Sequence, residues 1–157
     1  MSLQKIKELN ISQSQDFFEK IDGFATILLE WNKVHNLSGS FTKESVFAQV
    51  YDSLFPMSFY EGFEGSVLDI GSGAGFPAIA LAIAMPSVSF TLVEPSKKRV
   101  SFLNYLKIKL KLNNVTIIDK RIEECEKKIY NTITSKAVMD ADRLLALVGD
   151  MMDENSV

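Results

Sequence analysis

Three glycines lie within five residues in the segment VLDIGSGAGFP, which runs from Val67 to Pro77. The first four residues of this segment are typical of a buried strand, and the turn Gly71-Ser72-Gly73-Ala74-Gly75 follows at once. Glycine permits a positive φ and leaves room for a ligand to approach the backbone. The same turn could serve only to join a strand to a helix. The chemistry of the side chains around it has to distinguish between these two roles.

Two acidic residues follow two successive predicted strands. Asp69 precedes the glycines in the pattern D-x-G-x-G-x-G, and a carboxylate there disfavours a pyrophosphate at the N-terminus of the next helix. It favours a ligand with positive charge, and S-adenosylmethionine carries an ammonium and a sulfonium group. Glu94 stands where nucleoside-binding α/β proteins place an acid that accepts hydrogen bonds from the ribose hydroxyls. The alternative for Glu94 is an exposed acid at a strand end. A nicotinamide oxidoreductase is disfavoured because its fingerprint needs glycine in place of Phe76.

The elements that would position these residues alternate between strands and helices. Short apolar and β-branched runs predict strands over 66–70, 89–93, 115–118 and 132–135. Helices are predicted between them over 75–84, 97–112 and 123–128, and a last helix over 138–152. Two earlier helices are predicted, over 14–34 with Ser12 or Ser14 as N-cap and from Thr42 to Leu54. This pattern predicts an α/β fold with a doubly wound, mostly parallel sheet and two parts, an N-terminal helical extension (1–65) and a cofactor-binding core (66–157).

The composition is that of an ordinary globular domain, with 157 residues and a net charge of −3. Cys125 is the only cysteine, so an intrachain disulfide is excluded, and a structural thiol is the expected role. The single histidine, His35, is expected to be a packed or capping group rather than a base. We expect no metal site. The sequence has neither a membrane-spanning apolar run nor a secretory signal, which predicts a cytoplasmic protein.

Positive charge is concentrated in one part of this acidic chain. The segment from Pro95 to Ile118 has no acidic residue and contains Lys97, Lys98, Arg99, Lys107, Lys109 and Lys111. A local cationic patch on an acidic protein indicates a localised contact with a polyanion. The alternative is a solvated helix face without a binding partner.

The whole chain resembles the RsmG family, also called glucose-inhibited division protein B. The matching segments are EWNKVHNLSG (30–39), DSL (52–54), VLDIGSGAGFPAIALAIAMP (67–86), KKRVSFL (97–103) and KRIEE (120–124). Members of this family are class I methyltransferases that act on N7 of a guanine in the 530 loop of bacterial 16S rRNA. The resemblance therefore implies S-adenosylmethionine as cofactor and 16S rRNA as partner, with the assembled small ribosomal subunit as the favoured form of the substrate.

The residues and the resemblance together give a set of expected site residues. The glycine loop and the two acids predict cofactor contacts at Asp69, Gly71, Gly73, Gly75 and Glu94. The resemblance adds Phe76, with Ile122 and Glu123 near the adenine and Lys136 after the last predicted strand. Each of the first three has a simpler alternative: Phe76 as a core residue, Ile122 as an ordinary apolar contact and Glu123 as a first-turn helix acid. The candidates for contact with RNA are Lys97, Lys98, Arg99, Arg121 and Asn36.

No catalytic residue is expected, because N7 of guanine has an in-plane lone pair and needs no deprotonation. Rate would come from alignment of the reacting atoms, with Lys136 as a contact on the acceptor side. The chain departs from the family pattern at Lys136, Gln49 and Ala78, where arginine, histidine and glycine are usual. It also stops at Val157, where such folds continue into two more strands, so we expect a core that is short at its C-terminus and has an uncovered sheet edge. A cofactor-binding protein without an acceptor site is the alternative function.

Overall fold

The computed structural model describes residues 1–9, 11, 15–37, 39, 41–60 and 63–157. The chain begins with a layer of helices, α1 (Leu3–Lys7), α2 (Gln15–His35), α3 (Lys43–Leu54) and the 3₁₀ turn η1 (Phe55–Ser58). The two long helices were predicted, whereas the short α1 was not. The N-cap candidates Ser12 and Ser14 lie outside the described residues. Thr42 opens α3 as expected, since its hydroxyl accepts from Ser45 N at 3.2 Å and the Ser45 hydroxyl accepts from Thr42 N at 2.9 Å.

The four strands have the predicted bounds and form one parallel sheet. They are β1 (Ser66–Ile70), β2 (Ser89–Val93), β3 (Val115–Ile118) and β4 (Thr132–Ser135), in the order β3-β2-β1-β4. The predicted α/β fold with a parallel sheet is confirmed. Because β1 lies between β2 and β4, the connections on its two sides run in opposite directions, and a crevice opens beyond its carboxyl end. The glycine loop that leaves β1 lies at this switch point.

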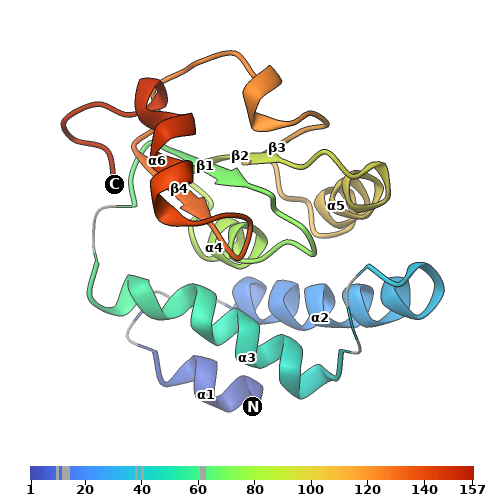
Figure 1. Ribbon diagram of the computed structural model, residues 1–157. Coiled ribbons are helices and arrows are strands. Elements are labelled where there is room, and N and C mark those ends of the chain that lie inside the picture. The colour runs from blue at the N-terminus through green and yellow to red at the C-terminus, as the bar shows by residue number, and fades with distance from the viewer. Residues whose placement is uncertain (10, 12–14, 38, 40, 61–62) are drawn as a thin grey trace.

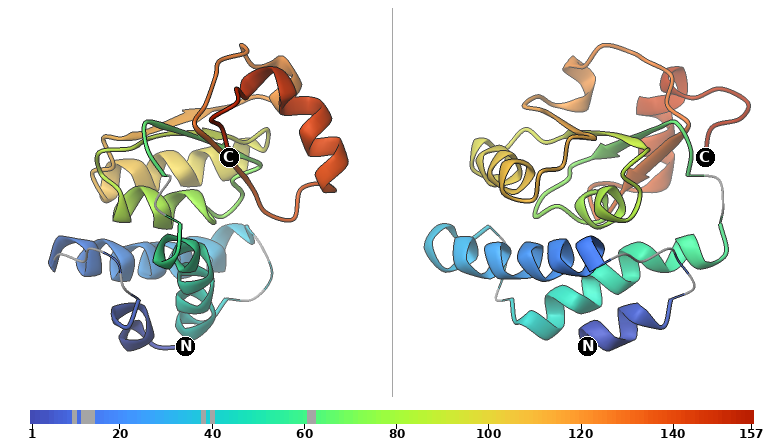
Figure 2. Two further views of the ribbon diagram at one scale, coloured as in Figure 1. Left: turned by 90° about the vertical axis from the view of Figure 1, so that its left-hand side faces the viewer. Right: turned by 180° about the vertical axis from the view of Figure 1, so that it is seen from behind.

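The sheet has a separate apolar core on each face. Side chains such as Val67 and Phe90 face α4 (Ala78–Ala84) and α5 (Lys97–Lys109) in a core that also includes the N-terminal helices. Leu68 and Ile70 face the opposite way, toward α6 (Ala141–Val148) and η3 (Gly149–Met151). Figure 1 shows α4 and α5 between the sheet and the layer of α1, α2 and α3, and Figure 2 shows the same layers from two further sides.

Several predicted helix bounds were wrong, each for a local reason. Helix α4 begins at Ala78 rather than at 75 because the loop continues through Pro77, and α5 ends at Lys109 before Lys111, whose φ is 52°. Helix α6 begins only at Ala141, since the Asp140 carboxylate caps it by accepting from Arg143 N at 2.9 Å. Where a helix over 123–128 was expected, the chain forms only the 3₁₀ turn η2 (Ile122–Glu124) and then an irregular segment.

The outer edge of β4 is partly covered by the last residue of the chain. Val157 N donates to Asn131 O at 2.9 Å, and Ile133 N donates to Val157 O at 2.7 Å, so Val157 pairs with the strand in a parallel sense. The expected uncovered edge is therefore bonded at this point. Among the residues that the structure describes, no helix is long and apolar enough to cross a membrane.

Candidate functional site

The loop after β1 turns sharply at each of its three glycines. Gly71, Gly73 and Gly75 have φ values of 70°, 57° and 95°, which confirms the expected need for glycine. A Cβ on Gly71 would lie 2.5 Å from Val138 Cγ2, and one on Gly75 would lie 2.8 Å from Ile79 Cγ1. Gly71 N donates to Val93 O at 2.8 Å, which fastens the loop to the end of β2. All three glycines therefore set the path of the backbone, and Gly71 and Gly75 also leave no space for a side chain.

Glu94 connects the glycine loop to the start of α5. Its side chain is only 2% exposed, so it is not the exposed strand-end acid of the alternative interpretation. One carboxylate oxygen accepts from Gly73 N and the other from Ser96 N, both at 2.9 Å, and Arg99 Nη1 lies 3.9 Å from the carboxylate. An ionised carboxylate offers about four acceptor positions, so capacity remains for hydroxyl groups of a ligand.

Asp69 is a buried acid with one carboxylate oxygen that has no hydrogen-bond partner among the described residues. Because Asp69 and Thr134 are partners in the β1–β4 register, the Thr134 hydroxyl can donate to Asp69 Oδ1, at 2.7 Å. The other oxygen, Oδ2, is buried and has no partner among the residues that the structure describes. Burial raises the pKa of Asp69 to about 6. A buried, unpaired carboxylate oxygen is costly, so this position suits a ligand that brings a cation or a hydrogen-bond donor.

The raised pKa of Asp69 predicts a pH-dependent free energy of unfolding for the ligand-free protein. A raised folded-state pKa contributes stability that is complete below the ordinary value of 3.8 and is lost as the pH rises through about 6. Relative to Asp69→Asn, the wild type should lose about 1 kcal/mol between about pH 5 and about pH 8. Denaturant unfolding of both proteins at the two pH values measures this. A wild-type to variant difference that does not change with pH would contradict it.

A cleft of about 430 Å³ opens beyond the carboxyl ends of β1, β2 and β4. Its walls include five of the predicted cofactor or acceptor residues, which are Gly71, Gly73, Phe76, Glu94 and Lys136. Asp69 and Gly75 are absent from the lining and lie behind it. The helical layer supplies the opposite wall through Leu37, Phe41 and Gln49.

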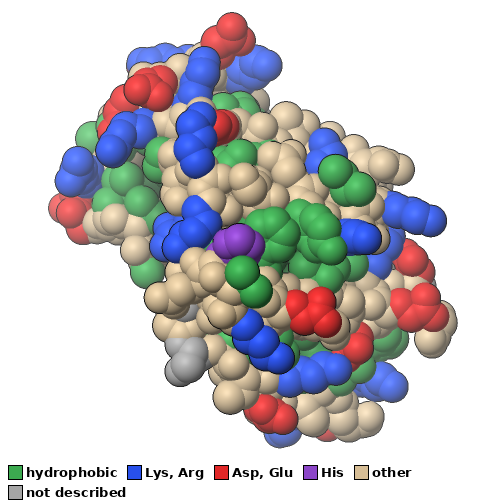
Figure 3. All heavy atoms as spheres, turned by 90° about the vertical axis from the view of Figure 1, so that its right-hand side faces the viewer, with side chains coloured by type: hydrophobic (Ala, Val, Ile, Leu, Met, Phe, Trp, Pro, Cys, Tyr) green, Lys and Arg blue, Asp and Glu red, His purple; other side chains and the backbone are tan. Residues whose placement is uncertain are grey.

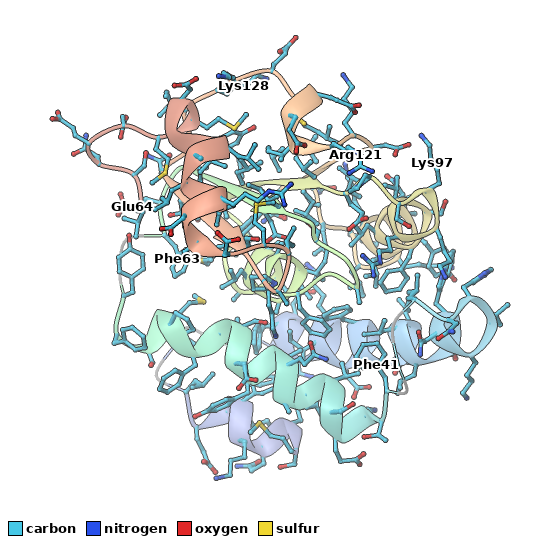
Figure 4. All side chains as sticks on the ribbon, viewed as in Figure 1. Phe41, Phe63, Glu64, Lys97, Arg121 and Lys128 are labelled. Carbon is cyan, nitrogen blue, oxygen red and sulfur yellow. The ribbon has the colours of Figure 1, made fainter. Side chains whose placement is uncertain are left out.

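A second pocket of about 220 Å³ continues from the first and shares Gly71, Pro95 and Val138 with it. This pocket is lined by the predicted adenine-side residues Ile122 and Glu123 and by Arg121. In Figure 4, Arg121, which lines the second pocket, lies on the upper side of the sheet. Phe41, which lines the first pocket, lies on the helical layer below the sheet. The fold thus brings the predicted residues from the ends of four strands to one region.

Lys136 is oriented toward the cleft by the segment after β4. Its ammonium lies 5.8 Å from the centroid of the Phe76 ring, which in turn packs at 5.1 Å from the Phe24 ring. Phe76 is largely buried and also lines the cleft. Its position is therefore compatible with both expected roles, a core residue and a contact with the cofactor. Ala137, the next residue, has a φ of 56° and redirects the chain so that Val138 lies against Gly71.

The three cations at the start of α5 each have a partner within the protein. Lys97 pairs with Asp119, and Arg99 approaches Glu94. Lys98 Nζ donates to His35 O at 2.8 Å and to Asn36 O at 2.9 Å, at the end of α2. These contacts fasten α5 to its surroundings. Contact of RNA with Lys97, Lys98, Arg99, Arg121 and Asn36 stays a prediction.

Sequence reasoning did not identify Thr134, Val138, Leu37 or Phe41 as site residues. Thr134 could have been found only from the β1–β4 register, and Val138 only from the turn at Ala137.

His35 is exposed, and its ring centroid lies 4.8 Å from that of Trp31. Cys125 is half-buried, its thiol donates to Arg121 O at 3.4 Å, and burial raises its pKa. No group of three or more His, Cys, Asp or Glu within the described residues is placed to hold a metal ion.

The sequence matches a known family over most of its length. A family model described as GidB, rRNA small subunit methyltransferase G, matches residues 18–157. The chain is 41% identical to the ribosomal RNA small subunit methyltransferase G of Aliarcobacter butzleri over 98% of this chain and 79% of that protein. It is 48% identical to the Helicobacter hepaticus protein of the same name, over 79% of this chain and 68% of that one.

Solved structures of methyltransferases share the fold at low sequence identity. Coclaurine N-methyltransferase bound to N-methylheliamine and SAH is 17% identical with a TM-score of 0.63; the match covers 98% of this chain and about half, 52%, of that one. A putative protein-L-isoaspartate O-methyltransferase from Plasmodium falciparum, in complex with S-adenosyl-L-homocysteine, is 16% identical with a TM-score of 0.56, over 98% of this chain and 79% of that one.

Proposed function

The chain belongs to the family of rRNA small subunit methyltransferase G, and from this premise we propose that it transfers a methyl group from S-adenosylmethionine to N7 of a guanine in the 530 loop of 16S rRNA. The observation that carries the proposal is the buried Glu94, which accepts from Gly73 N of the glycine loop in the wall of a cleft of about 430 Å³, with the buried Asp69 behind that loop. The acceptor would be presented by the small ribosomal subunit in the cytoplasm, where ribosomes are assembled.

The residues of the two adjoining pockets, with Asp69 behind them, fit S-adenosylmethionine. Glu94 would accept hydrogen bonds from the ribose hydroxyls, and Ile122 and Glu123 would contact the adenine. Asp69 has an unpartnered, buried carboxylate oxygen behind the glycine loop, which suits the positive charge of the methionine part. Gly71 and Gly73 would allow the ligand to lie against the backbone. When bound, S-adenosylmethionine supplies an electrophilic methyl group on a sulfonium.

The protein's part in the reaction would be to position the acceptor. N7 of guanine already carries a lone pair, so no side chain has to remove a proton from it. Phe76 and Lys136 lie side by side in the wall of the cleft and offer an apolar face and a cation for the guanine or its phosphate. Leu37 and Phe41 contribute apolar side chains to the opposite wall of the cleft. Alignment at near-attack distance accounts for most of the rate in such a displacement.

The two proposed parts of the chain divide this work. Residues 66–157 supply the cofactor pockets, and residues 1–65 form a helical extension that contributes Leu37, Phe41 and Gln49 to the wall of the cleft. Gln49, which stands where the family usually has histidine, and Lys136, which replaces arginine, both face this cleft. Two of the three differences from the family pattern therefore lie in the wall of the cleft, whereas the third, Ala78, is buried in α4.

Transfer of labelled methyl to small ribosomal subunits from a strain without this activity tests the proposal. We expect incorporation at one guanine of the 530 loop, identified as N7-methylguanosine by mass spectrometry. Protein-free 16S rRNA is the matched substrate, and we expect it to be methylated less. Cofactor binding without incorporation into either substrate would contradict the methyltransferase proposal and favour a cofactor-binding protein that lacks an acceptor site.

A further inference from the structure

A second concave surface lies outside the cofactor cleft, between the end of α2 and the middle of α5. It has a volume of about 240 Å³, and we call it the α2–α5 hollow; its lining residues are Ile27, Glu30, Trp31, Val34, His35 and Tyr105. The five α2 residues recur at the three- and four-residue spacing of one helix face. None of the lining residues belongs to the cofactor cleft or to the adenine-side pocket.

The hollow is built around a cluster of aromatic rings. The Trp31 ring lies 4.8 Å from the His35 ring, 5.1 Å from the Tyr105 ring and 5.7 Å from the Phe102 ring, measured between centroids. Phe102 is fully buried and holds the cluster to the core, whereas Tyr105 is 39% exposed. Because these rings are held by the core on one side and reach solvent on the other, they form a surface on which a flat ligand can stack.

The rim of the hollow exposes large apolar side chains to water. Val34 is 77% exposed and Ile108, one turn beyond Tyr105 on α5, is 73% exposed. Figure 3 shows this face, where the histidine borders a hydrophobic patch and both basic and acidic side chains stand around it. An apolar patch with a polar border is typical of a binding surface.

The charges around the hollow fit a polyanion whose bases are flat. Lys109 Nζ lies 5.4 Å from the Tyr105 ring centroid. Lys98 lies two helical turns before Tyr105 on the same side of α5, and two of its three N–H donors bond to carbonyls, which leaves one for a phosphate. Glu30 is the acidic residue in the lining, and a carboxylate can accept a hydrogen bond from the amino group of cytosine.

The end of α2 connects the hollow to the cofactor cleft along the chain, because His35 lines the hollow and Leu37 lines the cleft. Lys98 holds the carbonyls of His35 and Asn36, and the next residue, Leu37, lines the cleft. On α5, Arg99 lines the cleft and Tyr105 lines the hollow, which separates them by about 9 Å along the helix axis. One strand of RNA can therefore reach both sites.

We infer that the α2–α5 hollow stacks an unpaired base of the RNA substrate, at a place separate from the base that receives the methyl group. Trp31, His35 and Tyr105 supply the stacking surface, and Lys98 and Lys109 contact phosphates on either side of the stacked base. Stacking on aromatic rings is the usual way in which proteins hold unpaired RNA bases. The inference rests on the proposed function only for the identity of the polymer as RNA.

The fluorescence of Trp31 tests this directly, because it is the single tryptophan of the chain. A short single-stranded oligocytidylate should quench this fluorescence on binding. Tyr105→Ala should weaken the affinity by about 5- to 150-fold, the effect of losing one stacked base. Lys109→Ala should reduce the slope of log affinity against log salt by about 1. The matched control is Phe59→Ala, which removes an exposed ring next to Phe55 after η1 and should change neither quantity.

The outcome separates this inference from the proposed methyl transfer. If Tyr105→Ala and Lys109→Ala bind the oligonucleotide as the wild type does while the wild type methylates ribosomal subunits, the stacking site is refuted and the proposed function stands. If the variants lose affinity for the oligonucleotide and the wild type transfers no methyl group, the stacking site stands and the proposed function is refuted. Quenching by a purified small-subunit ribosomal protein, with none by RNA, would assign the hollow to a protein partner and also overturn the inference.

Discussion

Glu94→Ala is expected to weaken the binding of S-adenosylmethionine by about 10- to 150-fold. The carboxylate is buried and would accept charged hydrogen bonds from the ribose, each of which contributes about 1.5 to 3 kcal/mol. Its removal would also release Gly73 N and Ser96 N, which it now fixes at 2.9 Å, so the loop would lose part of its preorganisation. Isothermal titration calorimetry with S-adenosylmethionine and S-adenosylhomocysteine measures the change.

The control for Glu94→Ala is Glu126→Ala, which removes an exposed acid that lies outside both cofactor pockets. We expect it to keep wild-type affinity. Circular dichroism and the thermal midpoint show whether each variant is folded, so a loss of binding can be separated from a loss of structure. Wild-type affinity in folded Glu94→Ala would refute the assigned ribose contact.

Gly71→Ala should reduce cofactor affinity by about 100-fold or more and destabilise the ligand-free fold. Its φ of 70° costs a residue with a Cβ about 1 to 2 kcal/mol. The added methyl group would lie 2.5 Å from Val138 Cγ2, at the point shared by the two pockets. In the ligand-free protein the Val138 side chain can move away from the added methyl group. A ligand bound against the loop has no space to move away from it. Calorimetry and denaturant unfolding measure the two effects separately.

Two further variants complete this test. Gly149→Ala is the control, because its Cβ would enter open space and its φ is −53°. In the double variant Gly71→Ala with Val138→Ala, removal of the Val138 methyl groups should restore part of the lost stability without restoring cofactor binding. Recovery of wild-type affinity in the double variant would mean that Val138, rather than the ligand, limits the space beside Gly71.

The strands and the two buried acids were predictable because their signals are local. Each strand is a short apolar or β-branched run between turns, and the glycines after β1 permit the positive φ values that the loop adopts. Helix ends were less predictable because they depend on single events, such as the capping carboxylate of Asp140 and the positive φ of Lys111. The short α1 has only five residues, too few to give a helical pattern in the sequence.

Contacts between distant segments depended on the tertiary structure. The order β3-β2-β1-β4 brings Thr134 beside Asp69, and the turn at Ala137 brings Val138 onto Gly71. The cationic segment at the start of α5 indicated a polyanion contact, yet in the fold Lys97, Lys98 and Arg99 are each bonded within the protein. The aromatic hollow needed two helices that are far apart in the sequence to pack against each other.

The sequence by itself determined the fold class, the strand positions, the glycine loop and the acids beside it. These features follow from residue types and their spacing along the chain, through backbone sterics and hydrophobic periodicity. The tertiary structure alone decided which oxygen of Asp69 lacks a partner, how the helical layer forms one wall of the cleft and where a cluster of aromatic rings meets lysines on the surface. Those features depend on strand register and helix packing, which join residues that no local pattern connects.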